Sequence, residues 1–475
     1  MSFNTIKSTS KNYPPFRLTQ VLGDGATSPE YVAREDVITS LSLSNDGKLL
    51  FSGDAGGRVS VFKRDTPKNP WKTTRHGEKL PDLSFSFMCD AVCHEPSFDS
   101  LKGKELSPSI ISLGVVREVR NSMLLYTACS ERVSLWRVTK KPINISSDFG
   151  GDDNNNDTTE ENNTIQFVSS FGRLHKGLLI GACSNYRGTH LVCSDDENIS
   201  LLWDVEYSDK TSAVLIRGRK SSLHHRQTCM KLNKYRETKD VIVGYEDGVS
   251  VLSDWRCNQN TGIEFSLNDG KSSIIFDSSV LGVEYGIHDT NLVITRNAAT
   301  IGFFDIRNNK SSQTTINSKL VDFNPYIRHK LSSIKNSSHY NSDAFDICTM
   351  NDGRVLTGSY DSVFLAFEDD ENASLVNVDS AHLRSGRGDK RRVSKFVSEC
   401  PGNMRLLSEG DYIRSNIKAE CDIGKKILHL SCSQDKLMDS LPTFKSTTEP
   451  FIVAASHLGT LYIYGQYPQK DCEED

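Results

Sequence analysis

The sequence predicts an all-β protein in which one short unit is repeated seven times around a ring. Seven segments share a pattern in which a turn rich in Gly, Asp, Asn or Ser leads into a short strand of β-branched and aromatic residues. Most of these segments follow a second strand-like run that has a turn of its own. Several of the strands end close to a Trp or Phe. This combination is typical of a seven-bladed WD-repeat β-propeller with long loop insertions.

The turn-and-strand segments give the order of the predicted blades. Each joins a hairpin turn to alternating residues, which is the period of a strand with one buried face. In chain order they are GDAGGRVSVF (53–62), CSERVSLW (129–136), SDDENISLLW (194–203), GYEDGVSVL (244–252), TRNAATIGFF (295–304), GSYDSVFLAF (358–367) and SHLGTLYIY (456–464). We expect each of them to supply one strand of one blade.

The preceding runs supply the neighbouring strands. They include ITSLSLSNDGKLLFSG (38–53), GLLIGACSNYRGTHLVCS (177–194) and AFDICTMNDGRVLTGS (344–359). Each contains an Asn-Asp-Gly or Asn-Tyr-Arg-Gly turn between two apolar stretches, which predicts a hairpin. The expected unit therefore has three or four strands.

The chain is longer than seven such units require. A unit of this kind takes about 40–45 residues, or roughly 300 in all, and the chain has 475. We expect the remainder to be insertions at about 63–110, 139–170, 205–225, 308–342 and 368–424. The predicted organisation is a flexible N-terminus at 1–13, the propeller at 14–467 and an acidic tail at 468–475. Long loops on a rigid scaffold are where binding surfaces usually lie.

Composition and charge indicate a soluble globular protein. Hydrophobic residues make up 37% and charged residues 25%, and the formal net charge is −5. This balance implies no general attraction to nucleic acid or to anionic lipid, so we expect neither as a partner. The twelve cysteines include no CxxC pair, and the N-terminus lacks a secretory signal. We expect a reduced protein in the cytoplasm, with the nucleus as a second location.

Two predicted insertions differ in character. Residues 148–165, DFGGDDNNNDTTEENNTI, are acidic and almost free of apolar side chains, which predicts a disordered segment or an exposed hairpin tip. Residues 384–396, RSGRGDKRRVSKF, form a basic run. That run is either a solvated loop, or a patch for an acidic partner or a localisation signal.

Catalytic and metal-binding motifs are missing from the sequence. There is no GxxxxGK[ST], HExxH or GxSxG pattern, and no GxGxxG that opens a helix. Cys89, Cys93 and His94 have partial zinc spacing but lack a second pair of ligands, so buried thiols are the better interpretation. The pair His224-His225 stands in a polar loop. We expect no catalytic residue, no cofactor and no metal, and a binding platform rather than an enzyme.

The repeat and its insertions together resemble a known family. The residues that carry the resemblance are VITSLSLSNDGKLLFSGDAGGRVSVF (37–62), CHEPSFDSLKGKELSPSI (93–110), SERVSLWRV (130–138), DVIVGYEDGVSVLSDWR (240–256), NPYIRHKLSSI (324–334), FDICTMNDGRVLTGSYDSVF (345–364), GKKILHL (424–430) and TLYIYGQ (460–466). Along nearly its whole length the chain resembles the WD-repeat 55-kDa B-type regulatory subunits of serine/threonine protein phosphatase 2A, as a divergent member.

The resemblance implies a non-catalytic regulatory role in a heterotrimer. Members of that family bind the phosphatase scaffold subunit, which is built of HEAT repeats, and through it the catalytic subunit. The upper face of their propeller is acidic and recruits phosphoprotein substrates. Tethering a substrate beside a separate active site raises its local concentration.

Five residues match substrate-binding positions of the family. Asp195 and Asp196 match its acidic groove, with an allowance of one residue because this sequence has an extra residue before Trp203. His175 matches a groove histidine, and Asp99 and Lys102 match the rim. The alternative for Asp195 and Asp196 is an ordinary pair of turn aspartates, and for His175 a plain surface histidine. His94 and Glu95 are expected to be structural.

The sequence also departs from the family pattern. Ala55 replaces a groove lysine, and Arg34 replaces an acidic residue before the first strand. The polar NSSHYNS (336–342) replaces aromatic groove residues, and the Asn/Asp-rich 139–170 replaces a longer hairpin that grips the scaffold. Substrate choice and scaffold geometry are therefore expected to differ.

A different class of protein remains as an alternative. Substrate receptors of cullin-type ubiquitin ligases end their blades in a WDxR-like pattern, and this chain contains FFDIR (303–307) and LSDWR (252–256). An Arg after Asp at a strand end can equally form an ion pair within a blade. The HEPSFDSLK and NPYIRHKL segments have no counterpart in that class, nor in a bare propeller scaffold without a phosphatase.

Overall fold

The computed structural model places the strands of the chain and the turns that join many of them. It describes residues 16–23, 33–66, 71–73, 79–81, 83–99, 104–106, 108–119, 122–139, 165–171, 177–206, 214–216, 225–256, 262–267, 279–286, 292–297, 300–306, 318–322, 346–350, 355–358, 363–369, 372–377, 405–406, 427–432, 451–456 and 459–466. Of the predicted segment 148–165, all but Ile165 lies outside these ranges, as do the segment 384–396 and the predicted boundaries near 13 and 467; these stay predictions.

The described strands form six four-stranded sheets and one five-stranded sheet, all of them antiparallel and open, which we number as blades I to VII. Blade I is β2 (Ile38–Leu43), β3 (Leu49–Asp54), β4 (Arg58–Arg64) and β7 (Phe85–Val92). Blade II is β10 (Ser112–Val119), β11 (Ser122–Ala128), β12 (Val133–Thr139) and β13 (Ile165–Phe171). Blade III is β14 (Leu179–Ser184), β15 (His190–Asp195), β16 (Ser200–Asp204) and β17 (Val214–Ile216). Blade IV is β18 (Gln227–Leu232), β19 (Asp240–Tyr245), β20 (Val249–Asp254) and β21 (Ile263–Ser266).

The remaining blades follow the same order from the inner to the outer strand. Blade V is β22 (Gly282–Tyr285), β23 (Leu292–Arg296), β24 (Thr300–Asp305) and β25 (Ser318–Asp322). Blade VI is β26 (Ile347–Thr349), β27 (Val355–Gly358), β28 (Val363–Asp369), β29 (Asn372–Asn377) and β30 (Arg405–Leu406). Blade VII is β31 (Ile427–Cys432), β32 (Phe451–Ser456), β33 (Thr460–Gln466) and β1 (Phe16–Leu22). Two short hairpins pair β5 (Trp71–Thr73) with β6 (Lys79–Pro81), and β8 (Ser97–Asp99) with β9 (Lys104–Leu106).

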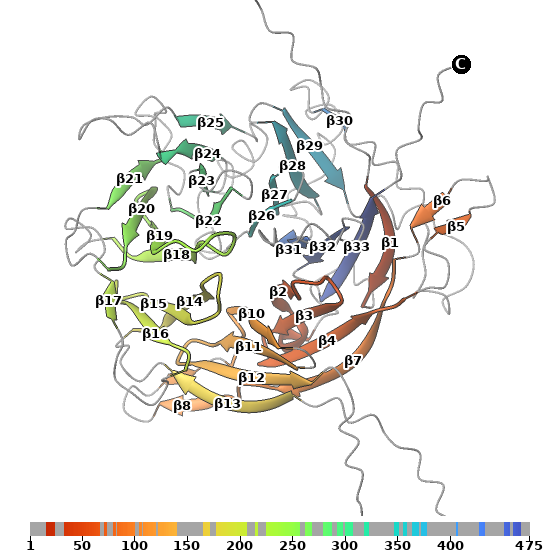
Figure 1. Cartoon of the computed structure of the whole chain (residues 1–475), viewed down its shortest axis with the longest axis horizontal. Coiled ribbons are helices and arrows are strands. Elements are labelled where there is room, and N and C mark those ends of the chain that lie inside the picture. Colours follow the sequence, from red (N-terminus) through yellow and green to blue (C-terminus); the bar gives the residue numbers. More distant parts are fainter. Residues whose placement is uncertain are drawn as a thin grey trace, which may run out of the picture.

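The blades are arranged in a ring (Figure 1). Each innermost strand contacts the innermost strand of the next blade, from β2 through β10, β14, β18, β22 and β26 to β31, and β31 contacts β2 again. Blade VII contains both the N-terminal strand β1 and the last strand β33, which are directly paired. The predicted all-β, seven-bladed architecture is therefore confirmed.

A buried glutamine joins the outer strands where the ring closes. The side chain of Gln20 on β1 donates from Nε2 to the carbonyl of Phe85 at 2.9 Å, and its Oε1 accepts from the Phe85 amide at 2.7 Å. Phe85 belongs to the outer strand of blade I and contacts Phe451 of blade VII, with ring centroids 5.6 Å apart. Blades VII and I are thus held together by polar as well as apolar contacts.

Each of the seven predicted turn-and-strand segments overlaps the third strand of a blade, and the strand continues beyond the segment's end. These strands are β4, β12, β16, β20, β24, β28 and β33. The second-strand runs at 38–53, 177–194 and 344–359 hold the first two strands of blades I, III and VI. The first, second and third strands could be recognised in the sequence because neighbouring blades cover them, and buried strands carry a clear apolar pattern.

The predicted insertion ranges are too wide. β7, β17, β25 and β29 lie inside the ranges 63–110, 205–225, 308–342 and 368–424, and β13 lies in 139–170 except for its last residue, Phe171. Each of them is the fourth strand of its blade. A fourth strand forms the rim of the ring and is half exposed. β13, for example, buries only Phe171 fully, so its sequence lacks the alternation by which a strand is recognised.

The core is divided into clusters that lie between neighbouring blades. One cluster joins blades I and II through Phe51, Val59 and Leu125, and another joins blades II and III through Tyr126, Leu135 and Trp203. Buried hydrogen bonds cross the same boundaries, such as that from the Tyr126 hydroxyl to the Ala182 carbonyl at 3.0 Å. Among the described residues, no helix is long and apolar enough to span a membrane.

Candidate functional site

The strand order defines two faces of the ring. We call one face of the ring the connection face; it carries the turns between second and third strands and the connections between blades. We call the other the opposite face; it carries the turns between first and second strands and between third and fourth strands. This division follows from the antiparallel order of strands within every blade.

Three of the five predicted substrate-binding residues, Asp99, Asp195 and Asp196, lie in described segments at the connection face. Asp195 and Asp196 form the turn between β15 and β16. Asp99 ends the short strand β8, in the connection from blade I to blade II. His175 and Lys102 lie outside the described residues, within the connections from blade II to III and from blade I to II, and of the Asp99 side chain nothing is described. Substrate binding by these residues stays a prediction.

Asp195 is buried and holds its own turn. Its side chain is 0% exposed. Oδ1 accepts hydrogen bonds from the backbone amides of Glu197 at 3.1 Å and of Ile199 at 2.8 Å. Asn198 takes the left-handed conformation at φ 67° within this turn, and its Oδ1 accepts from the Gln227 amide of blade IV. The alternative of a structural turn aspartate therefore describes the position of Asp195.

Asp196 is the better placed of the pair for contact with another molecule. It is half-buried, and the next residue, Glu197, is exposed. Asp196 is fixed against the start of blade III, because Oδ1 accepts from the Leu178 amide at 2.7 Å and its own amide donates to the Leu178 carbonyl at 2.9 Å. A Cβ placed on Gly177 would stand 2.1 Å from Asp196 Oδ1, so this arrangement requires glycine at 177.

Further acidic side chains occur on the connection face at blades I and II. Glu35, Asp36, Glu95 and Glu131 are exposed, and all occur in turns or connections at this end of the strands. Arg58, a base of the same face, is already paired with Asp36 at 2.7 Å and Asp54 at 2.8 Å. These ion pairs raise the pKa of Arg58. Arg132 and Arg226 are also exposed on this face. Acidic residues still outnumber basic ones among its described positions, which favours a basic ligand.

The CHEP segment (residues 93–96) packs onto blade I, as expected. The amides of Cys93 and His94 donate to the Gly57 carbonyl, at 2.8 and 3.1 Å. Gly57 has φ +85°, and a Cβ there would stand 2.1 Å from the His94 carbonyl oxygen. Burial raises the pKa of the Cys93 thiol to about 12. Cys93 is therefore an inert, buried thiol.

His94 belongs to a buried polar network that sequence reasoning missed. Its Nε2 lies 2.9 Å from Thr127 Oγ1, which also accepts from Trp136 Nε1 at 2.9 Å. Burial, reinforced by the nearby charge of Arg132, lowers the pKa of His94 to about 4. The signal available in the sequence was a His before blade II, followed by a Thr on its second strand and a Trp on its third. The expected structural role of His94 agrees with this position.

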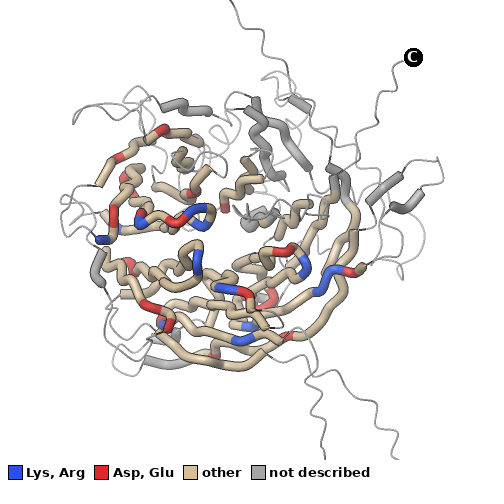
Figure 2. Tube along the Cα trace, in the orientation of Figure 1, with Lys and Arg blue, Asp and Glu red and all other residues tan. Residues whose placement is uncertain are grey.

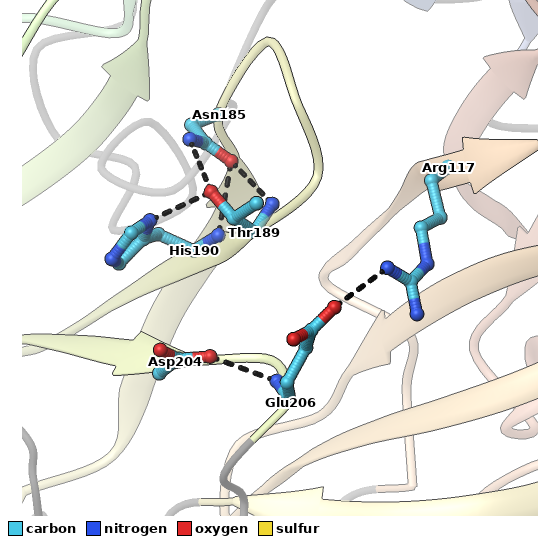
Figure 3. A network of polar contacts seen from close by, with 6 residues as sticks. All are labelled: Arg117, Asn185, Thr189, His190, Asp204 and Glu206. Atoms are coloured by element: carbon cyan, nitrogen blue, oxygen red, sulfur yellow. Dashed lines mark hydrogen bonds and ion pairs between the residues drawn. The ribbon is translucent and has the colours of Figure 1, made fainter.

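The opposite face carries a separate set of polar contacts around blade III. Asn185 organises a turn, because its Oδ1 accepts from the amides of Thr189 and His190 at 2.9 and 3.0 Å (Figure 3). Glu206 accepts from Arg117 of blade II at 3.1 Å. Figure 2 shows acidic and basic positions interspersed over the described part of the ring. These contacts join strands and blades, so they are structural.

A cavity of about 190 Å³ lies between the inner strands. Serines, asparagines and two lysines are among the residues that line it. One of the lysines, Lys234, is paired with the buried Glu284 at 3.3 Å, and the neighbouring Tyr235 hydroxyl lies 2.6 Å from Thr349 Oγ1 of blade VI. Among the described residues, no group of three metal-ligating side chains occurs here or elsewhere.

Two departures from the family pattern and one alternative motif fall on described residues. Ala55 occupies the turn before β4, and Arg34 begins a short 3-10 segment at Arg34–Asp36. Arg256 of the LSDWR motif binds Asp254 of the same strand end at 2.5 Å, which is the ion pair within a blade that the sequence allowed. Residues 336–342 lie outside the described part.

A closed ring of seven antiparallel blades defines the class of protein as a β-propeller. No protein-family model matches the chain. The chain is 22% identical over 429 residues to serine/threonine-protein phosphatase 2A regulatory subunit sur-6 of Caenorhabditis elegans, which covers 83% of this chain and 82% of that protein.

Relatives from other kingdoms carry the same description. The chain is 22% identical over 485 residues to the beta isoform of the 55 kDa B-type regulatory subunit of serine/threonine protein phosphatase 2A from Arabidopsis thaliana, covering 88% of this chain and 92% of that protein. It is also 22% identical over 460 residues to the B-type regulatory subunit of protein phosphatase PP2A from Schizosaccharomyces pombe, covering 88% and 93%. These similarities over most of the chain support the resemblance to the 55-kDa B-type family, whose members are regulatory and non-catalytic. None of these three relatives is named as a ubiquitin-ligase receptor.

Proposed function

We propose that this protein is a non-catalytic regulatory subunit of protein phosphatase 2A. It binds a scaffold subunit built of HEAT repeats together with the catalytic subunit, and it recruits phosphoprotein substrates through the connection face. The observation that carries this proposal is the similarity to named regulatory subunits over more than four fifths of the chain. The confirmed propeller architecture supports it, because a rigid ring with many loops is suited to holding two partners at once.

In this proposal the protein positions the substrate and takes no part in the chemical reaction. The phosphate ester is hydrolysed by the catalytic subunit, and the propeller holds the substrate beside that active site. A tethered substrate reaches an effective concentration in the millimolar range, so a weak docking contact is sufficient to increase turnover. Selectivity among substrates then depends on the connection face.

Within the proposed acidic groove, we assign different roles to the two neighbouring aspartates. Asp195 holds the turn, and Asp196 with the exposed Glu197 presents negative charge to the substrate. His175, Asp99 and Lys102 contribute from the two neighbouring connections. A basic segment close to the phosphorylated residue is the matching ligand, because opposite charges steer the encounter and fix its register.

Affinity purification from cell extract followed by mass spectrometry tests the assignment of partners. We expect the scaffold and catalytic phosphatase subunits to be recovered together with this protein. Recovery of a cullin-ligase adaptor without phosphatase subunits would contradict the proposal and favour the alternative class.

The location of the protein is part of the same proposal. We propose that it resides in the cytoplasm and also in the nucleus, where phosphoprotein substrates of both compartments are accessible. Fluorescence microscopy of the tagged chain tests this, and confinement to an organelle other than the nucleus would contradict it.

A further inference from the structure

The cavity between the inner strands lies at the opposite-face end of the ring's centre. In the described part of the chain, its lining comes from six blades and includes the turns at 44–45 in blade I, 185–186 in blade III and 234–235 in blade IV. Its volume of about 190 Å³ is that of roughly six water molecules in the liquid. The cavity can therefore hold a small molecule but not a folded segment.

The turn between β18 and β19 reaches across the centre and fixes the shape of this cavity. The Tyr235 hydroxyl lies 2.6 Å from Thr349 Oγ1 of blade VI, so the turn contacts a blade that is not its neighbour. In the same turn, Glu237 pairs with Arg187 of blade III at 2.6 Å. Contacts to two other blades hold the turn in one position. The cavity is therefore formed before any ligand binds, as ligand sites usually are.

Two lysines and one acid, Asp346, are the charged residues of the described lining. Lys234 is compensated, because it pairs with the buried Glu284 of blade V at 3.3 Å. Lys231 on β18 forms no ion pair within the described part of the chain, either with Asp346 or with another acid. The lining thiol Cys183 supplies no counter-charge, since burial raises its pKa to about 12 and keeps it neutral. Lys231 is therefore a half-buried cation that lacks an anion.

Three neutral polar residues of the lining have side chains that bind no other described residue. They are Ser42 and Asn45 of blade I and Ser431 of blade VII, and all three are half-buried. Hydroxyl and amide groups in such positions are satisfied by water or by the polar atoms of a ligand. A molecule in the cavity can thus engage Lys231 through an anionic group and these side chains through hydroxyl groups.

We propose that this cavity binds a small hydroxylated molecule with one anionic group, either a carboxylate or a phosphate ester. The anionic group pairs with Lys231, and the hydroxyl groups bind the polar side chains of blades I and VII. One anionic group is the expected number, because Lys234 already has Glu284 and the nearby Asp346 repels further negative charge. Asp196 lies on the connection face, so such a ligand does not compete with a substrate bound there.

Saturation-transfer NMR on the purified protein tests the inference with four probes, namely glycerate, glycerol 3-phosphate, glycerol and citrate. We expect glycerate or glycerol 3-phosphate to bind with a Kd of about 1 mM or lower, which is usual for a ligand of this size. The tighter of these two shows whether the anionic group is a carboxylate or a phosphate ester. Glycerol lacks the anion and citrate carries three carboxylates, so both should bind about tenfold more weakly or worse.

Variants of Lys231 test the position of the bound probe. Lys231→Met should raise the Kd about tenfold or more, because it removes the charge that the anionic group needs. Lys231→Arg keeps that charge and should retain binding. Lys63→Met removes one charge from an exposed position outside the cavity; it is the matched control and should leave the Kd unchanged. The bound probe should also raise the melting temperature of the wild type and leave that of Lys231→Met unchanged.

Three results would overturn the inference. The first is that neither glycerate nor glycerol 3-phosphate binds the wild type. The second is that citrate binds more tightly than both, and the third is that Lys63→Met weakens binding as much as Lys231→Met. Either of the last two would indicate a general attraction to surface charge and not a site in the cavity. No phosphatase subunit takes part in these measurements, so they test the cavity separately from the proposed function.

Discussion

The buried histidine of the CHEP segment makes the stability of blade II depend on pH. The pKa of His94 is lowered from 6.5 to about 4 in the folded protein, whereas the unfolded chain protonates it near 6.5. The folded state therefore binds fewer protons, and the free energy of unfolding falls as the pH drops from 6.5 toward 4. From this difference we expect a loss of about 1 kcal/mol at pH 5.5 and about 2–3 kcal/mol at pH 4.5.

Comparison of the wild type with His94→Gln isolates this contribution. Other groups titrate in the same range, but they are common to both proteins and cancel in the difference. Urea unfolding followed by tryptophan fluorescence at pH 7.5, 6.5, 5.5 and 4.5 provides the measurement. We expect the variant to be less stable at pH 7.5, because it disturbs the contact with Thr127, and to lose less stability on acidification. Parallel pH profiles for the two proteins would refute the reasoning.

Two further perturbations follow from close contacts in the ring. Gly177→Ala should displace Asp196, since the added Cβ would stand 2.1 Å from its carboxylate oxygen. This variant should bind a basic phosphopeptide more weakly than the wild type and bind the scaffold equally well. Gly181→Ala, with nothing within 4 Å of the added carbon, is the control, and equal effects of both substitutions on peptide affinity would contradict the expectation. Gln20→Leu should lower the free energy of unfolding by about 2–4 kcal/mol, because it leaves two buried backbone groups of Phe85 without partners. Thr19→Val, which removes one half-buried hydrogen bond within blade VII, should cost less in the same urea titration, and the reverse order would argue against closure of the ring through Gln20.

The predictable part of the fold is the part that is buried between blades. Segments such as GDAGGRVSVF contain a hairpin turn and a strand that is covered on both sides. Their turn residues and apolar strand residues can therefore be recognised in the sequence. The fourth strands have no such pattern, because solvent permits polar residues along the rim. β13 reads IQFVSSF and exposes four of its seven residues, which is why the range 139–170 resembles an insertion in the sequence alone.

The turn that contains the two candidate aspartates was predictable from the sequence, but the different positions of their side chains were not, and substrate binding there stays a prediction. The resemblance indicated the turn CSDDENISLLW, and the strand order places that turn on the same face as the connections that contain His175 and Asp99. The sequence could not distinguish Asp195 from Asp196, since adjacent acids in a turn look alike. Only the register of β15 with β16 decides that Asp195 turns inward to the backbone amides while Asp196 stays partly exposed. His94 and Thr127 lie 33 positions apart in the chain, so their contact could be identified only from the fold and not from the sequence.

The central claim is that this propeller joins a phosphatase core as its regulatory subunit. The most direct measurement is the mass, by sedimentation or mass photometry, of the complex formed when the purified full-length protein is mixed with purified scaffold and catalytic subunits of protein phosphatase 2A. The account predicts a single species that contains one copy of each of the three chains. Separate migration of the propeller and an intact scaffold–catalytic pair, at concentrations where a related B-type regulatory subunit assembles, would contradict it.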